Sequence, residues 1–218
     1  MTKKRIVICV LLSSLLLVPA LSQGTVVLDQ SFPTISSSSG FGYNPFVTPH
    51  TNLIKAQTFT VGLAGKLATV EAFMVQWTSD GGNYSLDILN TSGGVPTYSS
   101  LGTITRPLAS LPPSPDWDWV SFDVSFLNIQ VTPGEVLAMA FSAPNPGAAD
   151  LGYGLGGYLG GSQFYSIDKG NFQPLDGDLN FKTYVDTGTP SAVPEPTTLL
   201  LLGLGLIGLT GIRRKMQR

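Results

Sequence analysis

The chain has 218 residues, of which 43% are hydrophobic and 12% are charged, and its formal net charge is −2. Seven of its twelve Lys and Arg residues lie in the two terminal segments, so residues 23–186 hold five basic and thirteen acidic residues and a net charge of −8. An acidic surface of this kind argues against binding to nucleic acid or to anionic lipid, because both carry negative charge. The same stretch has a length that suits one domain.

The first 22 residues have the three parts of a secretory signal peptide. A basic start at Lys3, Lys4 and Arg5 is followed by an apolar run over residues 6–18, and then by Ala20-Leu21-Ser22. We expect signal peptidase to cut after Ser22, with Ala20 as a second site; an uncleaved membrane anchor is the alternative. The single cysteine, Cys9, lies inside the apolar run, so the mature protein is expected to lack disulfides and thiolate metal sites.

Residues 23–186 show the alternation of apolar and polar side chains that is typical of β-strands. The alternation is clearest in the segments 26–32, 84–88, 120–126 and 179–185. Residues 70–77 and 136–141 are apolar on both sides, as for strands covered on two faces, and this predicts a core position for Trp77. Turn-forming Gly, Pro, Asp and Asn residues separate the segments. The pattern predicts an all-β fold, an antiparallel β-sandwich of the jelly-roll kind, without a long amphipathic helix before the tail.

Motifs of the common catalytic sites do not occur in their required context. His50 is the single histidine, in a loop by composition, which excludes a multi-histidine zinc site, and no G-x-S-x-G turn accompanies it. Gly152, Gly154 and Gly157 match the spacing of a dinucleotide-binding loop. They lie in a Gly- and Tyr-rich stretch, residues 147–161, which we predict to be a long loop or an irregular edge strand. We therefore predict that the protein is not an enzyme.

Trp117 and Trp119 are the candidate ligand contacts. In Trp117-Asp118-Trp119 the two indole rings lie on one face of a strand, beside acids that can bind hydroxyl groups. Aromatic rings of this kind can stack on sugar rings, and packing in the core is the alternative that the sequence leaves open.

Acidic residues gather in the turns late in the domain, at Asp116, Asp118, Asp168, Asp176 and Asp178. Asp176 and Asp178, on either side of a glycine and before a strand, form a candidate Ca²⁺ site, because calcium prefers oxygen ligands. An ordinary solvated turn is the alternative. Two of these acids could also form a glycosidase pair, but the sequence does not give their separation. Calcium is the one cofactor considered.

The C-terminal segment combines a Pro-rich linker, an apolar run and a basic end. Residues 187–196 form the linker and contain Pro194, Glu195 and Pro196; residues 197–212 are apolar; residues 213–218 are basic. As a helix the apolar run spans about 24 Å, somewhat less than a hydrocarbon core of about 30 Å. We expect a transmembrane helix whose basic end stays cytoplasmic.

This order closely resembles the PEP-CTERM sorting signal of Gram-negative bacteria, with Pro194, Glu195 and Pro196 matching the motif and Arg213, Arg214 and Lys215 matching the basic finish. The resemblance implies recognition by an exosortase, a membrane-embedded protease, and release or transfer at the outer surface. A plain C-terminal anchor is the alternative. The stretch before the tail is also similar to exported β-sandwich domains found upstream of such signals, through residues 56–60, 94–96, 131–135 and 178–185. That similarity implies a surface location and supplies no active-site residues.

Together these features predict an exported, non-catalytic cell-surface or extracellular-matrix protein associated with exopolysaccharide or biofilm. Its expected partners are signal peptidase and exosortase during processing, the membrane through the C-terminal helix before processing, and polysaccharide afterwards, but not nucleic acid. The expected location is an inner-membrane-anchored precursor and then the cell surface or matrix. The alternative is a carbohydrate-binding or glycoside-hydrolysing extracellular module.

Overall fold

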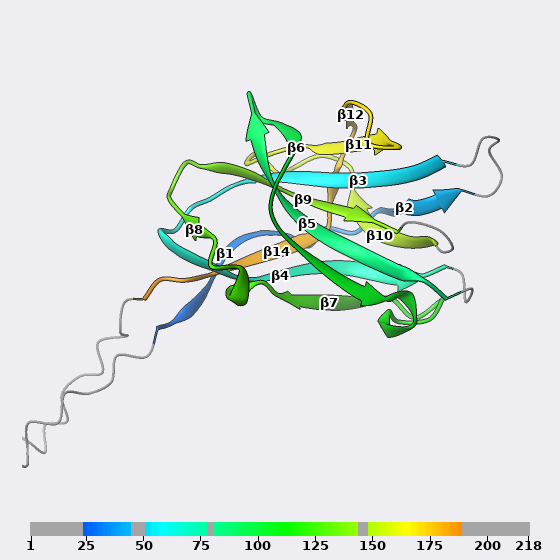
Figure 1. Cartoon of the computed structure of the whole chain (residues 1–218), viewed down its shortest axis with the longest axis horizontal. Coiled ribbons are helices and arrows are strands. Elements are labelled where there is room, and N and C mark those ends of the chain that lie inside the picture. Colours follow the sequence, from blue (N-terminus) through cyan, green and yellow to red (C-terminus); the bar gives the residue numbers. More distant parts are fainter. Residues whose placement is uncertain (1–23, 45–50, 78–80, 144–147, 189–218) are drawn as a thin grey trace, which may run out of the picture. The chain divides into compact units, whose positions relative to one another are not determined.

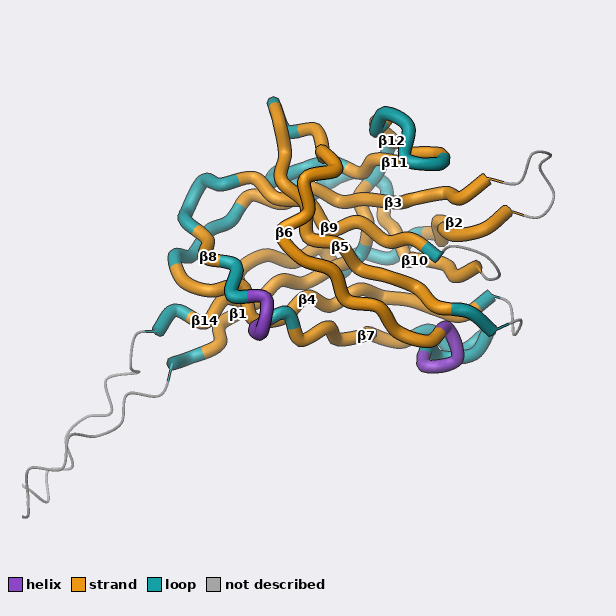
Figure 2. Tube along the Cα trace, viewed as in Figure 1, coloured by secondary structure: helices purple, strands orange, loops and turns teal. Residues whose placement is uncertain are grey.

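Strands make up most of the structure, a computed structural model that describes residues 24–44, 51–77, 81–143 and 148–188. Figures 1 and 2 show strands throughout, with two short 3₁₀ helices, η1 (Leu108–Ser110) and η2 (Ser125–Leu127). The strands are β1 (Val26–Phe32), β2 (Ser37–Asn44), β3 (Thr51–Thr60), β4 (Gly65–Gln76), β5 (Asn83–Ser92), β6 (Val95–Pro107), β7 (Asp118–Asp123), β8 (Gln130–Val131), β9 (Val136–Ser142), β10 (Ala148–Gly154), β11 (Gln163–Ile167), β12 (Gln173–Leu175), β13 (Asp178–Leu179) and β14 (Phe181–Asp186). The all-β prediction is confirmed.

The named strands pair antiparallel in one continuous sheet. Its main path runs β1-β14-β4-β10-β2-β3-β9-β5-β6, with β7 and β8 paired to β4, β11 paired to β3 and β12, and β13 paired to β10. Strand β10 pairs with β4 through Ala149–Leu151 and with β2 through Ala148–Tyr153. Because β10 bridges these strands, the sandwich-like arrangement is built from a single sheet and not from two separate ones.

Two layers of this sheet face each other across the main core. Phe122 of β7 lies 6.0 Å, between ring centroids, from both Tyr84 of β5 and Phe141 of β9. Phe181 of β14 lies 6.2 Å from Phe59 of β3. These contacts place β14, β4 and β7 opposite β3, β9 and β5, as Figure 1 shows in its lower and upper parts. Burial of each such large side chain stabilises the fold by about 1.5–3 kcal/mol.

A smaller cluster covers the outer face of the second layer. Strand β9 is buried on both faces, as the sequence predicts for residues 136–141, because Leu137, Met139 and Phe141 enter the main core. Its other face presents Ala138 and Ala140 to a second cluster, whose remaining members are Ile54, Ala56, Leu89, Phe164 and Phe172. The hairpin of β11 and β12, which carries Phe164 and lies beside Phe172, therefore packs on the outside of β3 and β9.

Two local predictions are wrong. Trp77 is 67% exposed and not part of the core, because β4 ends at Gln76 and an apolar run does not mark where strand pairing stops. In the stretch 147–161, residues 148–154 form β10 inside the sheet and are neither loop nor edge strand, whereas residues 155–161 lie between β10 and β11, as the loop alternative predicts. Glycine permits this close packing: a Cβ on Gly154 would stand 2.2 Å from the Thr34 carbonyl oxygen.

The two ends of the strand-bearing unit, Val26–Thr187, lie side by side, because Val26 of β1 pairs with Asp186 of β14. The predicted signal peptide (residues 1–22), the linker beyond residue 188, the sorting motif, the tail helix (197–212) and the basic end (213–218) lie outside the described residues, as does His50. Among the residues that the structure describes, no helix is long and apolar enough to cross a membrane.

Candidate functional site

The aromatic cluster, formed by Phe73, Trp117 and Trp119, lies on the outer face of the β14-β4-β7 layer. Phe122 points from β7 into the core, so Trp119, an odd number of residues away, points outward. Trp119 is opposite Phe73 in the β4–β7 register, and their ring centroids are 5.5 Å apart. Trp117 stacks on the same Phe73 ring at 5.6 Å with an interplanar angle of 18°. The three rings are partly exposed, so the structure brings the two predicted tryptophans together at the surface.

Polar side chains border the aromatic cluster on the β14 side. Lys182 Nζ lies 3.9 Å from the Trp119 ring centroid and 3.0 Å from Glu71 Oε2. The Tyr184 hydroxyl donates a hydrogen bond of 3.3 Å to the same Glu71 oxygen. Burial, and then the negative charge of Glu71, raise the pKa of Tyr184. The ammonium group covers one side of Trp119 by a cation–π contact and holds the carboxylate beside it.

Gly152 of β10 makes room for the central ring of the cluster. A Cβ at this position would lie 2.9 Å from Phe73 Cδ1 and 2.7 Å from Asn180 Oδ1, closer than real Cβ contacts allow. Sequence reasoning missed Gly152, Phe73, Glu71 and Lys182. Residues 70–77 are predicted to be covered on both faces, so nothing local marked Phe73 as a surface residue; the other three depend on which strands are neighbours.

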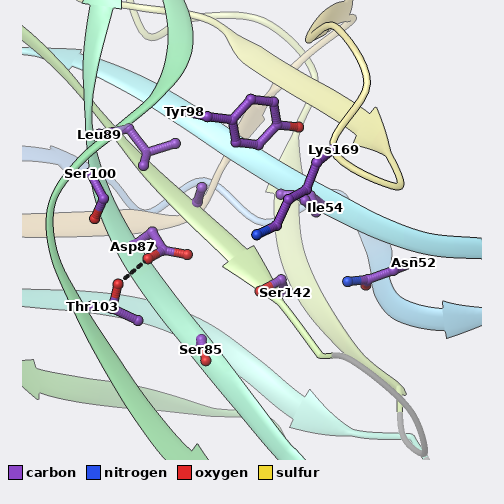
Figure 3. Close-up of a pocket in the computed structure, with 11 residues that line it drawn as sticks. Asn52, Ile54, Ser85, Asp87, Leu89, Tyr98, Ser100, Thr103, Ser142 and Lys169 are labelled. Carbon is purple, nitrogen blue, oxygen red and sulfur yellow. Dashed lines mark hydrogen bonds between the residues drawn. The ribbon is translucent and has the colours of Figure 1, made fainter.

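A groove of about 510 Å³ lies on the outer face of the other layer, and Figure 3 shows its lining. Its floor comes from β3, β5 and β9, and its sides come from β6 and from the loop that joins β11 to β12. Side chains with polar groups in its lining include Asp87, Thr103, Tyr98, Ser142, Asn52 and Lys169. None of them was a candidate in the sequence, because they come together only when these distant segments pair.

Tyr98 forms a rigid side of the groove. Its ring stacks on Phe172 with centroids 4.9 Å apart and an interplanar angle of 27°. Its hydroxyl donates to Ser166 Oγ at 2.5 Å, and Ser166 in turn donates to the Gly170 carbonyl at 2.7 Å. Across the groove the Thr103 hydroxyl donates to Asp87 Oδ1. The aromatic side and the carboxylate are therefore both held by neighbours.

The candidate calcium ligands Asp176 and Asp178 have different surroundings. Asp176 is exposed, whereas Asp178 is 6% exposed. Asp178 Oδ1 accepts a 3.0 Å hydrogen bond from the Gln57 side chain, and Oδ2 accepts one of 3.4 Å from the Tyr158 backbone N–H. Within the described ranges no three His, Cys, Asp or Glu residues stand close enough to hold a metal ion. Asp178 therefore has protein partners, and calcium binding stays a prediction.

Two further ionisable groups are buried. Asp150 of β10 is 5% exposed, and burial raises its pKa, with a hydrogen bond from Ser38 opposing the rise. Lys55 of β3 is 8% exposed, and burial lowers its pKa. Its ammonium nitrogen lies 5.8 Å from the Tyr165 ring centroid. Both groups influence stability, and neither lines the groove.

Comparison with known proteins identifies the C-terminal segment. The model of the PEP-CTERM protein-sorting motif matches residues 192–215. No curated protein matches the chain. Among solved structures, a clostridial cysteine protease, Cwp84 after propeptide cleavage, is similar with a TM-score of 0.50 and 14% identity over 74% of this chain and 40% of that chain. A second structure holds the cysteine protease and lectin-like domains of Cwp84, a surface layer associated protein of Clostridium difficile; its TM-score is 0.40 and its identity 12%, over 69% of this chain and 36% of that one.

These matches differ in what they establish. The chain spans about two fifths of the length of the first structure, and at 14% identity the likeness concerns the fold alone. The sorting motif is a match of sequence at the predicted place, so the chain carries a PEP-CTERM motif. The motif implies an extracellular protein that an exosortase processes.

Proposed function

We propose that this PEP-CTERM protein is a non-catalytic component of the cell surface or extracellular matrix, and that its β-domain binds exopolysaccharide through the aromatic cluster. The observation that carries the proposal is the sorting motif at residues 192–215, which directs an all-β unit to the outside of the cell. In this proposal the apolar segment 197–212 anchors the precursor in the inner membrane until an exosortase cuts the chain. The unit then meets the polymers that surround the cell.

The aromatic cluster supplies the chemistry that a sugar needs. A pyranose ring has an apolar C–H face that stacks on indole and hydroxyl groups at its edge that need hydrogen-bond partners. Trp117 stacks on Phe73 and is partly exposed, so part of its indole surface can contact a ligand. Glu71, Lys182 and Tyr184 add an acceptor and donors at the border of the cluster. This combination favours a neutral, hydroxyl-rich polymer.

A role without a chemical step agrees with the surroundings of the acidic side chains. Asp178 accepts hydrogen bonds from Gln57 and Tyr158, and Asp168 Oδ1 accepts one of 2.7 Å from the Asn52 backbone. These two carboxylates accept hydrogen bonds from other segments of the chain, and this accounts for their presence without a catalytic role. The competing proposal, a glycoside-hydrolysing module, predicts that the purified protein shortens a polysaccharide and that changing one Asp abolishes this. Observation of such turnover would replace the binding role by an enzymatic one.

Binding is tested by replacing both tryptophans. Trp117→Ala/Trp119→Ala should weaken binding of the mature protein to exopolysaccharide from its host by about tenfold or more, since stacking of one ring on an aromatic side chain contributes on the order of 1–3 kcal/mol in other ligands. The matched control is Phe126→Ala, because Phe126 is an aromatic side chain that is 63% exposed and stands outside the cluster. Affinity gels loaded with the polysaccharide give the measurement. Equal retardation of the double variant and the parent would contradict the proposed site, provided that both show the same circular dichroism and urea midpoint.

Processing at both ends is tested by mass. Intact-mass analysis of the protein from a host with an exosortase should show loss of the first 22 residues and of the apolar segment after Pro196. Substitution of Glu195 by Ala should leave the N-terminal cut unchanged and block the C-terminal one. Recovery of an unprocessed C-terminus from the parent chain would contradict sorting by an exosortase.

A further inference from the structure

The groove on the β3-β9-β5-β6 layer has the composition of a saccharide site. Apolar atoms of Ile54, Leu89 and Ala140 form part of its lining, and the partly exposed ring of Tyr98 forms a side. Hydroxyl groups and an amide surround these atoms, with one carboxylate and one ammonium group. Its volume of about 510 Å³ falls within the roughly 300–1,000 Å³ of small-molecule sites. The mixture of an apolar surface with many short polar groups fits the two-sided character of a sugar ring.

The two charged groups of the groove face each other across it, and the loop that carries one of them is anchored to the sheet. Lys169 points across the groove toward Asp87 in Figure 3, and within the described residues its ammonium group forms no ion pair. The loop that carries Lys169 is anchored to β3 in both directions. The Asn52 N–H donates to Asp168 Oδ1 at 2.7 Å, and the Asp168 N–H donates to the Asn52 carbonyl at 3.0 Å. This preorganisation reduces the entropy that a ligand must overcome on binding.

Charge selects a neutral ligand. One carboxylate and one ammonium group leave the groove itself without net charge, while residues 23–186 as a whole carry −8. A polyanion would be repelled by this surface, whereas a neutral sugar can donate hydroxyls to Asp87 and accept from Lys169.

The groove and the aromatic cluster lie on opposite layers of the sandwich. Phe122 of the first layer and Phe141 of the second contact each other in the core between them. Trp119 and Asp87 are on the outward faces of β7 and β5, on the far sides of that core. A polymer bound at one surface is therefore separated from the other by the thickness of the domain.

We propose that the groove is a second site, for a neutral hexose segment of polysaccharide, and that one copy of the protein joins two polymer strands. This inference rests on the proposed function for its first site. A chain with two separated sites converts binding into cross-linking, because each polymer strand offers many repeats. The protein would then act as a junction in the matrix as well as a component attached to it.

The test compares sites with matched charge changes. Asp87→Asn/Lys169→Gln keeps the shape of the groove and removes its charged donors and acceptors. This change should lower the affinity of the groove for the saccharide by tenfold or more. The control, Asp176→Asn/Lys66→Gln, makes the same charge change at positions outside the groove. Titration calorimetry of the mature protein uses short fragments of its host's exopolysaccharide as the probe. Light scattering with the intact polymer reports cross-linking.

We expect two sites per chain in the parent and the control, one in the groove variant, one in Trp117→Ala/Trp119→Ala, and growth of scattering particles only when both sites are present. One site in the parent that the groove variant retains would overturn the second site and leave the proposed function standing. Two sites in the tryptophan variant, with one in the groove variant, would support the groove while contradicting the aromatic cluster. Absence of any binding would overturn both.

Discussion

Replacing Asp178 by alanine removes a buried acceptor that joins three parts of the chain. Its Oδ1 accepts a hydrogen bond of 3.0 Å from Gln57 Nε2, and Gln57 is fully buried. The Gln57 side chain also donates a hydrogen bond of 3.0 Å to the Thr58 carbonyl and accepts one of 2.8 Å from the Leu179 N–H. In the variant one N–H of the Gln57 amide would be left without a partner, which costs about 1–3 kcal/mol. The weaker bond from Tyr158 adds less, so we expect a loss of about 3 kcal/mol of unfolding free energy.

The assay is urea unfolding of the mature protein, followed by tryptophan fluorescence in EDTA. The slope should stay constant and the midpoint should fall, since the surface exposed on unfolding hardly changes. Asp176→Ala is the matched control: this neighbouring aspartate is exposed, so its loss should shift the free energy by less than about 0.5 kcal/mol. Equal, small effects of the two variants would refute the reasoning, because the buried hydrogen bonds would then contribute nothing.

The same variants test calcium. If Asp176 and Asp178 together hold Ca²⁺ in the folded state alone, millimolar Ca²⁺ should raise the Tm of the parent by mass action, and both variants should lose that rise. Asp178 would have to exchange its hydrogen bonds from Gln57 and Tyr158 for the ion, and an equal Tm of the parent in EDTA and in Ca²⁺ would assign both residues to an ordinary turn.

Two further predictions concern stability. Burial raises the pKa of Asp150 above 3.8, so the stability that its protonated form contributes is lost as the pH rises through the folded-state pKa. Asp150→Asn should therefore have a higher urea midpoint than the parent at about pH 7, and its unfolding free energy should depend less on pH below that value. A steeper dependence of the unfolding free energy on pH in the variant would contradict this. Gly65 has φ +151°, and a Cβ added there would stand 2.3 Å from the Asp186 carbonyl oxygen. Gly65→Ala should therefore lower the unfolding free energy by at least about 1–3 kcal/mol. Gly134→Ala, where φ is +88° and nothing lies within 4 Å, should cost less in the same unfolding assay, and the reverse order would refute the argument from close contact.

The features that could be predicted from the sequence are those that depend on residues close together along the chain. The sorting motif is a short run of residues that an exosortase recognises as a segment, so it can be identified without a fold, and the family model matches it at residues 192–215. Strand class is similarly local, because side chains alternate with a period of two. Strand β9 was placed correctly as buried on both faces since its apolar residues are consecutive.

Tertiary structure decided where those strands begin, end and pair. Trp77 belongs to the same apolar run as the core residues of β4, but it lies just beyond the end of that strand and its side chain is 67% exposed. Gly152 and Gly154 lie in a stretch predicted to be a long loop or an irregular edge strand, yet their lack of a side chain is what lets β10 lie inside the sheet, close to Phe73 and Thr34.

The two surfaces depended on pairing most of all. Trp117 and Trp119 were recognisable as neighbours, but Phe73 joins them only through the β4–β7 register. The groove brings Asn52, Asp87, Tyr98 and Lys169 together from four separate segments. Local preference determines that each segment is a strand or a turn, whereas the choice of partner is set by how much apolar surface each pairing buries across the whole chain. That burial is a property of the folded sheet, and no window of sequence contains it.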